Sequence, residues 1–275
     1  MNNDPTAIDL NVDAALLLQD MAGIDSYPDV LVLLPNVFRP EDLDRVRAVV
    51  YEQLTRAGII EDGLVHPAVE HWLRCLYRPD VELVARVADT ELYSGPRGML
   101  RFSLVRSGET HVLALRYDDH VVIQPIFPQD NRLDAVADAL LAVLGSLPEA
   151  RFDPLRVDAD RFDTVPVDPV ERRSALIELG ASPRSAGVLG AAFGTVVRRA
   201  EVYMLEHHPG DVPLPDLCVQ VLDTQSGRVV VVPQRALDGQ ARLSVLPGDT
   251  ANVTAAVRAL VDLLPGGSWF DHSRE

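Results

Sequence analysis

The sequence predicts an α+β fold in which two similar halves share a central, largely antiparallel β-sheet, with helices packed mainly on one face. Two observations lead to this prediction. Residues 217–246 form three short runs rich in β-branched residues, separated by turns at Ser226-Gly227 and Asp238-Gly239, and a capped amphipathic helix follows them. The same order of three runs and one helix occurs in residues 100–148. The chain therefore reads as two copies of one unit.

The two copies are separated by an offset of 119 residues. Ser107-Gly108 matches Ser226-Gly227 at this offset, and the helix-capping Asp130 matches Asp249. A single long offset indicates two copies of a supersecondary unit rather than a solenoid array. Long strands leave unpaired edges unless they are joined or covered. The simplest arrangement is one continuous sheet with a pseudo-twofold axis.

The chain before the first copy is mainly helical. Helices are expected to begin at Asp13, Pro40 and Pro67, where a capping residue or a first-turn proline precedes apolar residues at helical spacing. Residues 81–88 form an extended run, and residues 89–98 have the Gly, Pro and Ser content of a loop.

A linker is expected between the halves. Residues 149–169 contain five Asp and three Pro without periodicity. We therefore predict a single domain, 1–275, made of two similar halves at about 1–148 and 170–270. After the linker the sequence predicts two short helices, a strand and a loop, at 170–179, 183–193, 201–205 and 207–215.

The composition indicates a globular, soluble protein. Hydrophobic residues make up 47% of the chain, and no apolar run is longer than six residues, far fewer than a bilayer span requires. The first residues lack the basic and apolar regions of a signal peptide, so we expect a cytoplasmic protein. Cys75 and Cys218 lie in apolar surroundings and are expected to be reduced thiols, with a disulfide as the alternative.

The charge balance excludes some classes of partner. The formal net charge is −16, from 41 acidic and 25 basic residues, and every basic residue is Arg. Nucleic acids and anionic membranes are bound by concentrated basic surfaces. We therefore expect neither nucleic-acid binding nor membrane insertion.

No catalytic or metal-binding motif is present in the sequence. The nucleotide-binding, nucleophile-elbow, H-E-x-x-H and C-x-x-C motifs are all missing. His66 and His71 are five residues apart, a spacing that does not readily place both on one ion. His207-His208 beside Glu206 is interpreted as a solvated loop, with adventitious metal binding as the alternative. We predict no catalytic residue, no metal site and no cofactor.

Two segments are candidates for a partner-binding surface. Leu92 and Tyr93 are apolar residues in the expected loop, where water penalises them unless a partner or the sheet itself covers them. The small residues of helix 183–193 would allow a partner helix to approach closely, although internal packing uses such residues too. The residues singled out for partner binding are Thr90, Glu91, Leu92, Tyr93, Arg97, Gly187, Val188, Ala191 and Phe193.

Three stretches of the chain also carry a family resemblance. They are residues 54–73 (LTRAGIIEDGLVHPAVEHWL), 226–235 (SGRVVVVPQR) and 246–269, which begins with LPGDT and ends with LLPGGSW. Their order and spacing resemble the EspG family, the ESX (type VII) secretion-associated proteins of mycobacteria. The similarity runs from residue 7 to Trp269. The tail (WFDHS) together with Pro-Glu-Asp-Leu at 40–43 inclines towards the member that serves the first-numbered ESX system.

The resemblance implies a cytosolic chaperone or adaptor that binds PE–PPE heterodimers before export. It implies that the partner is the tip of the PPE helical hairpin, held by the loop after the second strand and by the C-terminal helical part. Residues 89–98 and the helices of the second half correspond to these regions. A monomer or weak homodimer is expected.

Two alternatives stay open. One is an enzyme with an unrecognised small-molecule cleft, which a deep pocket with strongly shifted pKa values would favour. A flat sheet face with a shallow apolar groove would count against it. The other is a structural homodimer formed by edge pairing of strands.

Overall fold

The computed structural model describes residues 5–37, 39–91, 95–127, 133–210, 214–215, 217–236 and 239–274. The first half contains β1 (Ile8–Asn11), α1 (Val12–Ala22), the short 3-10 helix η1 (Asp29–Leu31), α2 (Pro40–Arg56), β2 (Ile60–Glu61), β3 (Leu64–Val65), α3 (Pro67–Tyr77), β4 (Val81–Glu91), β5 (Gly95–Ser107), β6 (Thr110–Tyr117), β7 (His120–Ile126) and α4 (Asp134–Leu144).

The second half repeats this order with small differences. It contains β8 (Leu155–Asp158), α5 (Ala159–Phe162), α6 (Pro169–Glu178), α7 (Pro183–Gly194), β9 (Val196–Glu206), β10 (Val219–Thr224), β11 (Gly227–Arg235), β12 (Ala241–Pro247) and α8 (Thr250–Val261). In each half, an edge strand and helices precede four consecutive strands, and a closing helix ends the unit.

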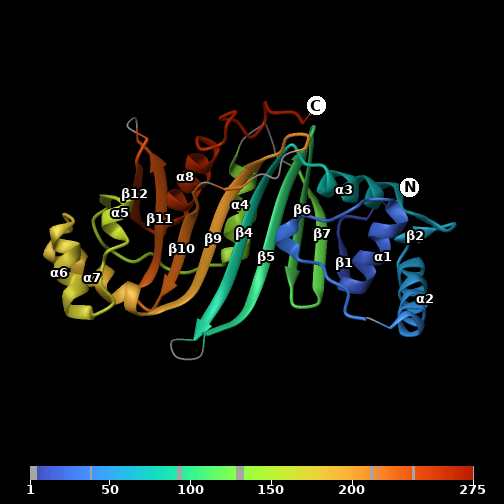
Figure 1. Ribbon diagram of the computed structural model, residues 1–275, viewed down its shortest axis with the longest axis horizontal. Coiled ribbons are helices and arrows are strands. Elements are labelled where there is room, and N and C mark those ends of the chain that lie inside the picture. Colours follow the sequence, from blue (N-terminus) through green and yellow to red (C-terminus); the bar gives the residue numbers. More distant parts are fainter. Residues whose placement is uncertain are drawn as a thin grey trace.

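One ten-stranded sheet joins the two halves (Figure 1). Its strand order is β1-β7-β6-β5-β4-β9-β10-β11-β12-β8, and the neighbouring strands in the described residues are antiparallel. The offset of 119 residues maps Val84 of β4 onto Tyr203 of β9, and these two residues face each other in the β4–β9 pair. The pseudo-twofold axis therefore passes between them. The predicted shared antiparallel sheet is confirmed.

The helices cover both faces of the sheet, so the expectation of helices mainly on one face is wrong. On β6, Val112 and Ala114 join the core formed with α1 and α3, whereas Leu113 joins the core formed with α4 and α8. On β11, Val229 packs towards α6 and α7, whereas Val230 packs towards α8. Strands buried on both sides are continuously apolar rather than alternating, which is the pattern of residues 229–232.

The segment expected to be a linker contributes to the sheet. Within residues 149–169, β8 pairs with β12, and α5 follows it directly. The backbone is also held against β11, because the Arg228 amide donates to the Pro148 carbonyl at 2.8 Å and the Ala150 amide donates to the Arg228 carbonyl at 2.9 Å. A four-residue edge strand is too short to give a periodic signal in the sequence.

The C-terminal segment packs against the centre of the first half. The Arg106 guanidinium on β5 donates to the Trp269 carbonyl at 2.5 Å and to the Asp80 carboxylate at 3.2 Å. The Trp269 indole is fully buried, and its N–H donates to His111 at 3.0 Å. Residues of β4–β6 and of the C-terminal segment thus share one core.

The two cysteines are free thiols in the structure, as expected. Burial raises the pKa of both Cys75 and Cys218. A search of the described residues finds no helix with the length and apolarity needed to span a bilayer.

Candidate functional site

The centre of one sheet face lies between two groups of helices. In the described residues, α1 and α3 pack on one end of this face and α6 and α7 on the other, and between them the short helix η1 packs against β4, β5 and β6. We call the middle part the open strip. It is formed by the side chains of β4 and β9 that point to this face, namely Glu82, Val84, Arg86, Glu201, Tyr203 and Leu205. Glu82 and Val84 are buried, and the other four are at least partly exposed.

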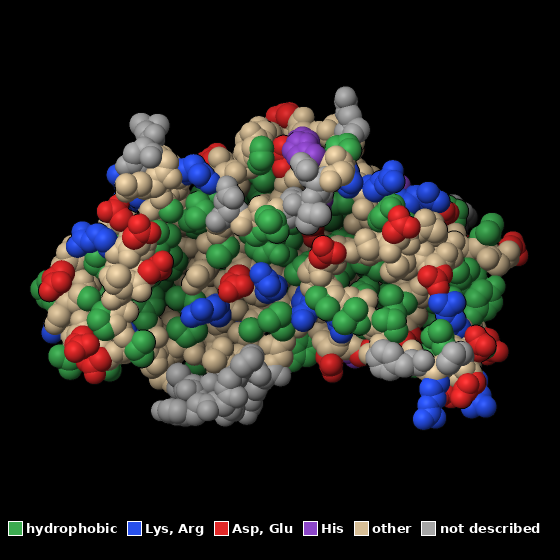
Figure 2. Space-filling model, in the orientation of Figure 1, with side chains coloured by type: hydrophobic (Ala, Val, Ile, Leu, Met, Phe, Trp, Pro, Cys, Tyr) green, Lys and Arg blue, Asp and Glu red, His purple; other side chains and the backbone are tan. Residues whose placement is uncertain are grey.

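The open strip carries a groove of about 460 Å³, which the segment around η1 also lines. Val84 and Tyr203 contribute to its floor, and Leu214, which is 81% exposed, lies on its rim. The Arg86 guanidinium lies 5.8 Å from the centre of the Tyr203 ring and forms an ion pair with Glu201 at 3.7 Å. Figure 2 shows apolar and charged side chains intermixed across this face. An apolar floor with a charged rim is typical of a protein–protein interface.

A row of arginines crosses the sheet next to this groove. Arg116, Arg101 and Arg86 are neighbours on β6, β5 and β4, and Glu201 on β9 continues the row. The buried Nε of Arg101 has no hydrogen-bond partner. Burial lowers the pKa of Arg101, and the charges of Arg116 and Arg86 lower it further. Like charges side by side are unfavourable in a sheet. Arg86 is paired with Glu201, and Arg116 donates to the carbonyls of Leu31, Val32 and Asp118.

The hairpin of β4 and β5 is longer than the sequence predicts. Residues 89–98 were expected to form a loop, but pairing continues through Asp89–Gly98, Thr90–Pro96 and Glu91–Gly95, with an irregularity after Asp89. The expected loop is therefore mostly strand, because cross-strand hydrogen bonding continues despite the Gly and Pro residues. Leu92 and Tyr93 lie outside the described residues. Arg97 belongs to strand β5, and only its backbone is described.

Helix α7 uses most of its singled-out residues for packing inside the molecule. Val188 and Phe193 pack against the core beneath α6 and α7, and the Phe193 ring meets Phe162 edge to face at 5.7 Å. Gly187 is half-buried, and Ala191 is exposed. The small residues allow close packing of α6, since Arg172 of α6 donates to the Gly190 carbonyl at 2.9 Å. Ala191 is the position with most access to a partner.

The two segments singled out for partner binding approach each other at one end of the central strands β4 and β9. Strand β9 begins directly after α7, and its residue Arg198 forms an ion pair with Asp89 at 2.5 Å. This contact raises the pKa of Arg198. Thr90 and Glu91 follow Asp89 towards the hairpin tip. Residues that are about a hundred positions apart in the sequence are thus brought together at the end of α7 and the base of the hairpin tip.

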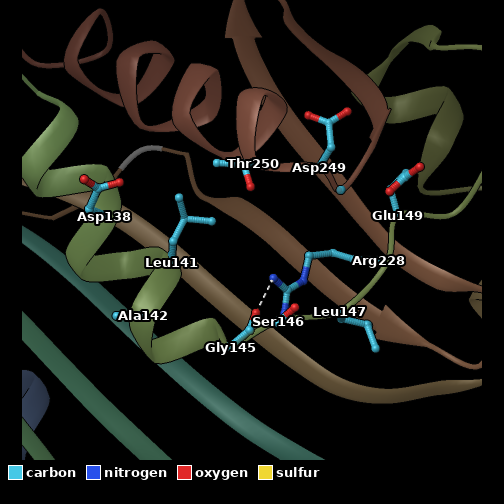
Figure 3. A pocket seen from close by; sticks show the side chains of 11 residues that line it. Asp138, Leu141, Ala142, Gly145, Ser146, Leu147, Glu149, Arg228, Asp249 and Thr250 are labelled. Carbon is cyan, nitrogen blue, oxygen red and sulfur yellow. Dashed lines mark hydrogen bonds between the residues drawn. The ribbon is translucent and has the colours of Figure 1, made fainter.

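A second depression, of about 600 Å³, lies on the opposite face between α4 and α8 (Figure 3). Its polar centre is Arg228. The Arg228 guanidinium donates to both carboxylate oxygens of Asp223, at 2.6 and 3.0 Å, and to the carbonyls of Leu144 and Gly145. These bonds hold the C-terminal end of α4 on the sheet, and they engage all three guanidinium nitrogens. The depression is therefore explained by a structural contact.

Sequence reasoning missed the open strip. Glu82 and Arg86 are polar positions among apolar ones, which is the ordinary pattern of a half-exposed strand, but Glu82 and Val84 are buried in the structure. Only the positions of η1 and of the two groups of helices reveal which part of this face is left open.

Comparison with known proteins places the chain in a family. A family model described as the EspG family matches residues 11–259. The ESX-1 secretion-associated protein EspG1 of Mycobacterium tuberculosis is 30% identical over 98% of this chain and 91% of its own length. The ESX-3 secretion-associated protein EspG3 of Mycolicibacterium smegmatis is also 30% identical, over 97% of this chain and 90% of its own length. Identity therefore does not separate these two systems.

A solved structure gives the same fold. It is described as the Mycobacterium tuberculosis type VII secretion system chaperone EspG5 in complex with a PE25–PPE41 dimer. The TM-score is 0.81 at 21% sequence identity, and the match covers 98% of this chain and 100% of that one. Together with the match over residues 11–259, this agreement confirms the resemblance in the sequence: the chain belongs to the EspG family.

Proposed function

We propose that this protein is a cytoplasmic chaperone of an ESX type VII secretion system. It binds a PE–PPE heterodimer through the tip of the PPE helical hairpin, keeps the pair soluble and directs it to the secretion machinery. Membership of the EspG family over nearly the whole chain supports this proposal. The related EspG5 is described as a chaperone in complex with a PE25–PPE41 dimer. Such a function requires binding and release, and no catalytic step.

The open strip is the observation that supports a binding function most directly. Its apolar floor and charged rim lie between two groups of helices, where the end of a helical hairpin would find both apolar anchors and polar partners. The described base of the β4–β5 hairpin and the junction between α7 and β9 lie together at one end of the central strands. We propose that they contact the partner through Thr90, Glu91, Leu92, Tyr93, Arg97, Gly187, Val188, Ala191 and Phe193.

The primary test is complex formation in solution. The purified protein is mixed with each PE–PPE pair encoded with its own ESX system and analysed by gel filtration with light scattering. We expect one pair to form a complex of one chaperone and one heterodimer. If every pair elutes separately from the protein, the proposed function is wrong.

Substitutions then locate the surface on the full-length chain. Leu92→Glu and Tyr93→Glu are expected to weaken partner binding by about thirtyfold or more, the usual effect of removing an interface anchor. Leu64→Glu is the matched control, because Leu64 is 73% exposed on β3, away from the open strip. Circular dichroism and thermal melting establish that each variant is folded. Unchanged affinity in the Leu92 and Tyr93 variants would remove the hairpin tip from the interface.

A second pair of variants tests whether helix α7 contacts the partner. Ala191→Glu places a charge on the exposed side of α7 and is expected to weaken binding, because the carboxylate would lose its hydration in the complex. Ala255→Glu makes the same change at an exposed position of α8, on the opposite face of the sheet. Equal affinities of the two variants would exclude α7 from the surface.

A further inference from the structure

Three side chains that can bind a metal ion meet at the end of β9. Glu206 is the last residue of β9, His208 lies in the loop that follows, and His272 belongs to the C-terminal segment. One ligand atom of each residue lies within 4.8 Å of the other two. Glu206 is buried, His208 is exposed and His272 is half-buried, so solvent reaches the group through His208.

Two of the three distances between ligand atoms match the geometry of a tetrahedral zinc site, and the third pair, His208 and His272, lies within 4.8 Å. Zinc binds imidazole nitrogen and carboxylate oxygen at about 2.0–2.2 Å, which places neighbouring ligand atoms about 3.3–3.5 Å apart in a tetrahedron. The Glu206 Oε1 atom lies 3.1 Å from His208 Nε2 and 3.5 Å from His272 Nδ1. A metal ion could therefore be accommodated with only small movements of these side chains.

Surrounding hydrogen bonds orient two of the three ligands. His272 Nε2 lies 2.9 Å from the His207 carbonyl and donates to it, which turns Nδ1 towards Glu206. The other carboxylate oxygen of Glu206 accepts from the Gly266 amide at 2.8 Å. Metal-binding histidines usually donate their second ring N–H to a carbonyl or carboxylate, and metal-binding carboxylates are usually hydrogen-bonded. Both features are present here.

We propose that Glu206, His208 and His272 bind a zinc(II) ion, with a fourth position open to water. Two imidazoles and one carboxylate suit zinc, whereas magnesium and calcium prefer sites made of oxygen ligands. The ion would join the C-terminal segment to the end of β9. It would also hold the loop after β9, whose residues His207 and Leu214 line the groove of the open strip.

This proposal departs from the sequence expectation of no metal site. The sequence shows Glu206 and His208 close together, but two ligands in a loop are common without a metal. The third ligand, His272, is 64 residues further along the chain. Only the packing of the C-terminal segment against β9 brings it within reach.

The first test is zinc binding by the full-length protein after treatment with a chelator and dialysis. Isothermal titration with zinc chloride is expected to give one site per chain, and zinc is expected to raise Tm because it binds only the folded site. Magnesium and calcium chloride at the same concentrations are expected to give neither effect. Absence of zinc binding, with the three side chains forming an ion pair only, would overturn the proposal.

The second test assigns the ligands. His208→Ala and His272→Gln are each expected to weaken zinc binding by more than about tenfold, since loss of even an outer partner of a ligand costs about 10–100-fold. His208 is the decisive position, because its side chain is half-exposed and its loss leaves the fold intact. His120→Ala is the control, at an exposed histidine on β7. Equal zinc affinity of His208→Ala and the unaltered protein would refute the assignment.

Discussion

Buried arginines hold this protein together at positions that are remote in the sequence. Arg106 connects β5 to Asp80 and to the C-terminal segment, and Arg228 connects β11 to Asp223 and the end of α4. The planar guanidinium can donate in several directions at once, which a Lys ammonium does less well. Because all 25 basic residues are Arg, composition alone could not single out these two.

His111 provides a pH-dependent contact at the residue scale. Its Nε2 accepts a hydrogen bond from the Trp269 indole, so this nitrogen carries no proton in the folded protein. Burial lowers the pKa of His111, the charge of Arg106 lowers it further, and the backbone of Glu109 partly opposes this. The unfolded chain has the ordinary His pKa of about 6.5.

The unfolded state therefore binds the proton more readily than the folded state. The contribution of His111 to the free energy of unfolding is fully present above pH 6.5 or so, and is lost as the pH falls through the lowered pKa. We predict that the stability lost between pH 7.5 and pH 5.5 is smaller in His111→Gln, measured by urea denaturation. His120→Gln, at an exposed site, should behave like the unaltered protein. An identical pH dependence in all three proteins would contradict the prediction.

At the scale of elements, the two Ser-Gly turns of the repeat have different surroundings. Gly108 and Gly227 both have positive φ, at 56° and 111°. A Cβ on Gly108 would meet nothing within 4 Å, whereas a Cβ on Gly227 would lie 2.6 Å from the Ala150 amide nitrogen. The segment between the halves crosses directly over the second turn. The sequence repeat predicts both turns. The segment around Ala150 leaves no space for a side chain at Gly227, whereas Gly108 has space for one.

We predict that Gly227→Ala destabilises the protein more than Gly108→Ala. Gly108→Ala is expected to cost about 1–2 kcal/mol from the left-handed backbone alone. Gly227→Ala is expected to cost about 1–3 kcal/mol more, because the backbone at Ala150 must shift to admit the methyl group. Chemical denaturation of the two variants measures the difference. An equal loss of unfolding free energy in the two variants would show that the segment around Ala150 can move without an energetic cost.

Helix starts are predictable from the sequence, whereas the extent of strands is not. Helices at Pro67 and Pro183 begin at these prolines in the structure, because an N-terminal proline loses no helical hydrogen bond. The extent of the β4–β5 hairpin and the strand β8 were missed. Pairing across strands maintains an extended backbone where local composition indicates a loop, and sequence periodicity does not report such pairing.

At the scale of the whole molecule, the β4–β9 pair is the junction between the halves. Nine residue pairs connect these strands, from Val81–Glu206 to Asp89–Arg198. Removing one half would expose a long apolar edge strand at the centre of the sheet. The core formed with α4 and α8 also includes residues of both halves, such as Val87 and Val202.

We therefore predict that neither half is a stable monomer. A fragment of residues 1–148, expressed alone, is expected to aggregate or to form a dimer through β4, as measured by gel filtration with light scattering. Co-expression with residues 149–275 is expected to restore a soluble 1:1 complex. A monomeric and cooperatively folded 1–148 fragment would instead indicate two separate domains.

The sequence by itself determined the class of fold, the two-copy organisation and the family. These properties depend on local periodicity, turn residues and the order of motifs, which are written along the chain. The tertiary structure alone decided that helices cover both faces, that part of the open strip stays accessible, and that His272 meets Glu206 and His208. These features depend on contacts between remote segments, and their positions follow from packing in three dimensions rather than from spacing along the chain.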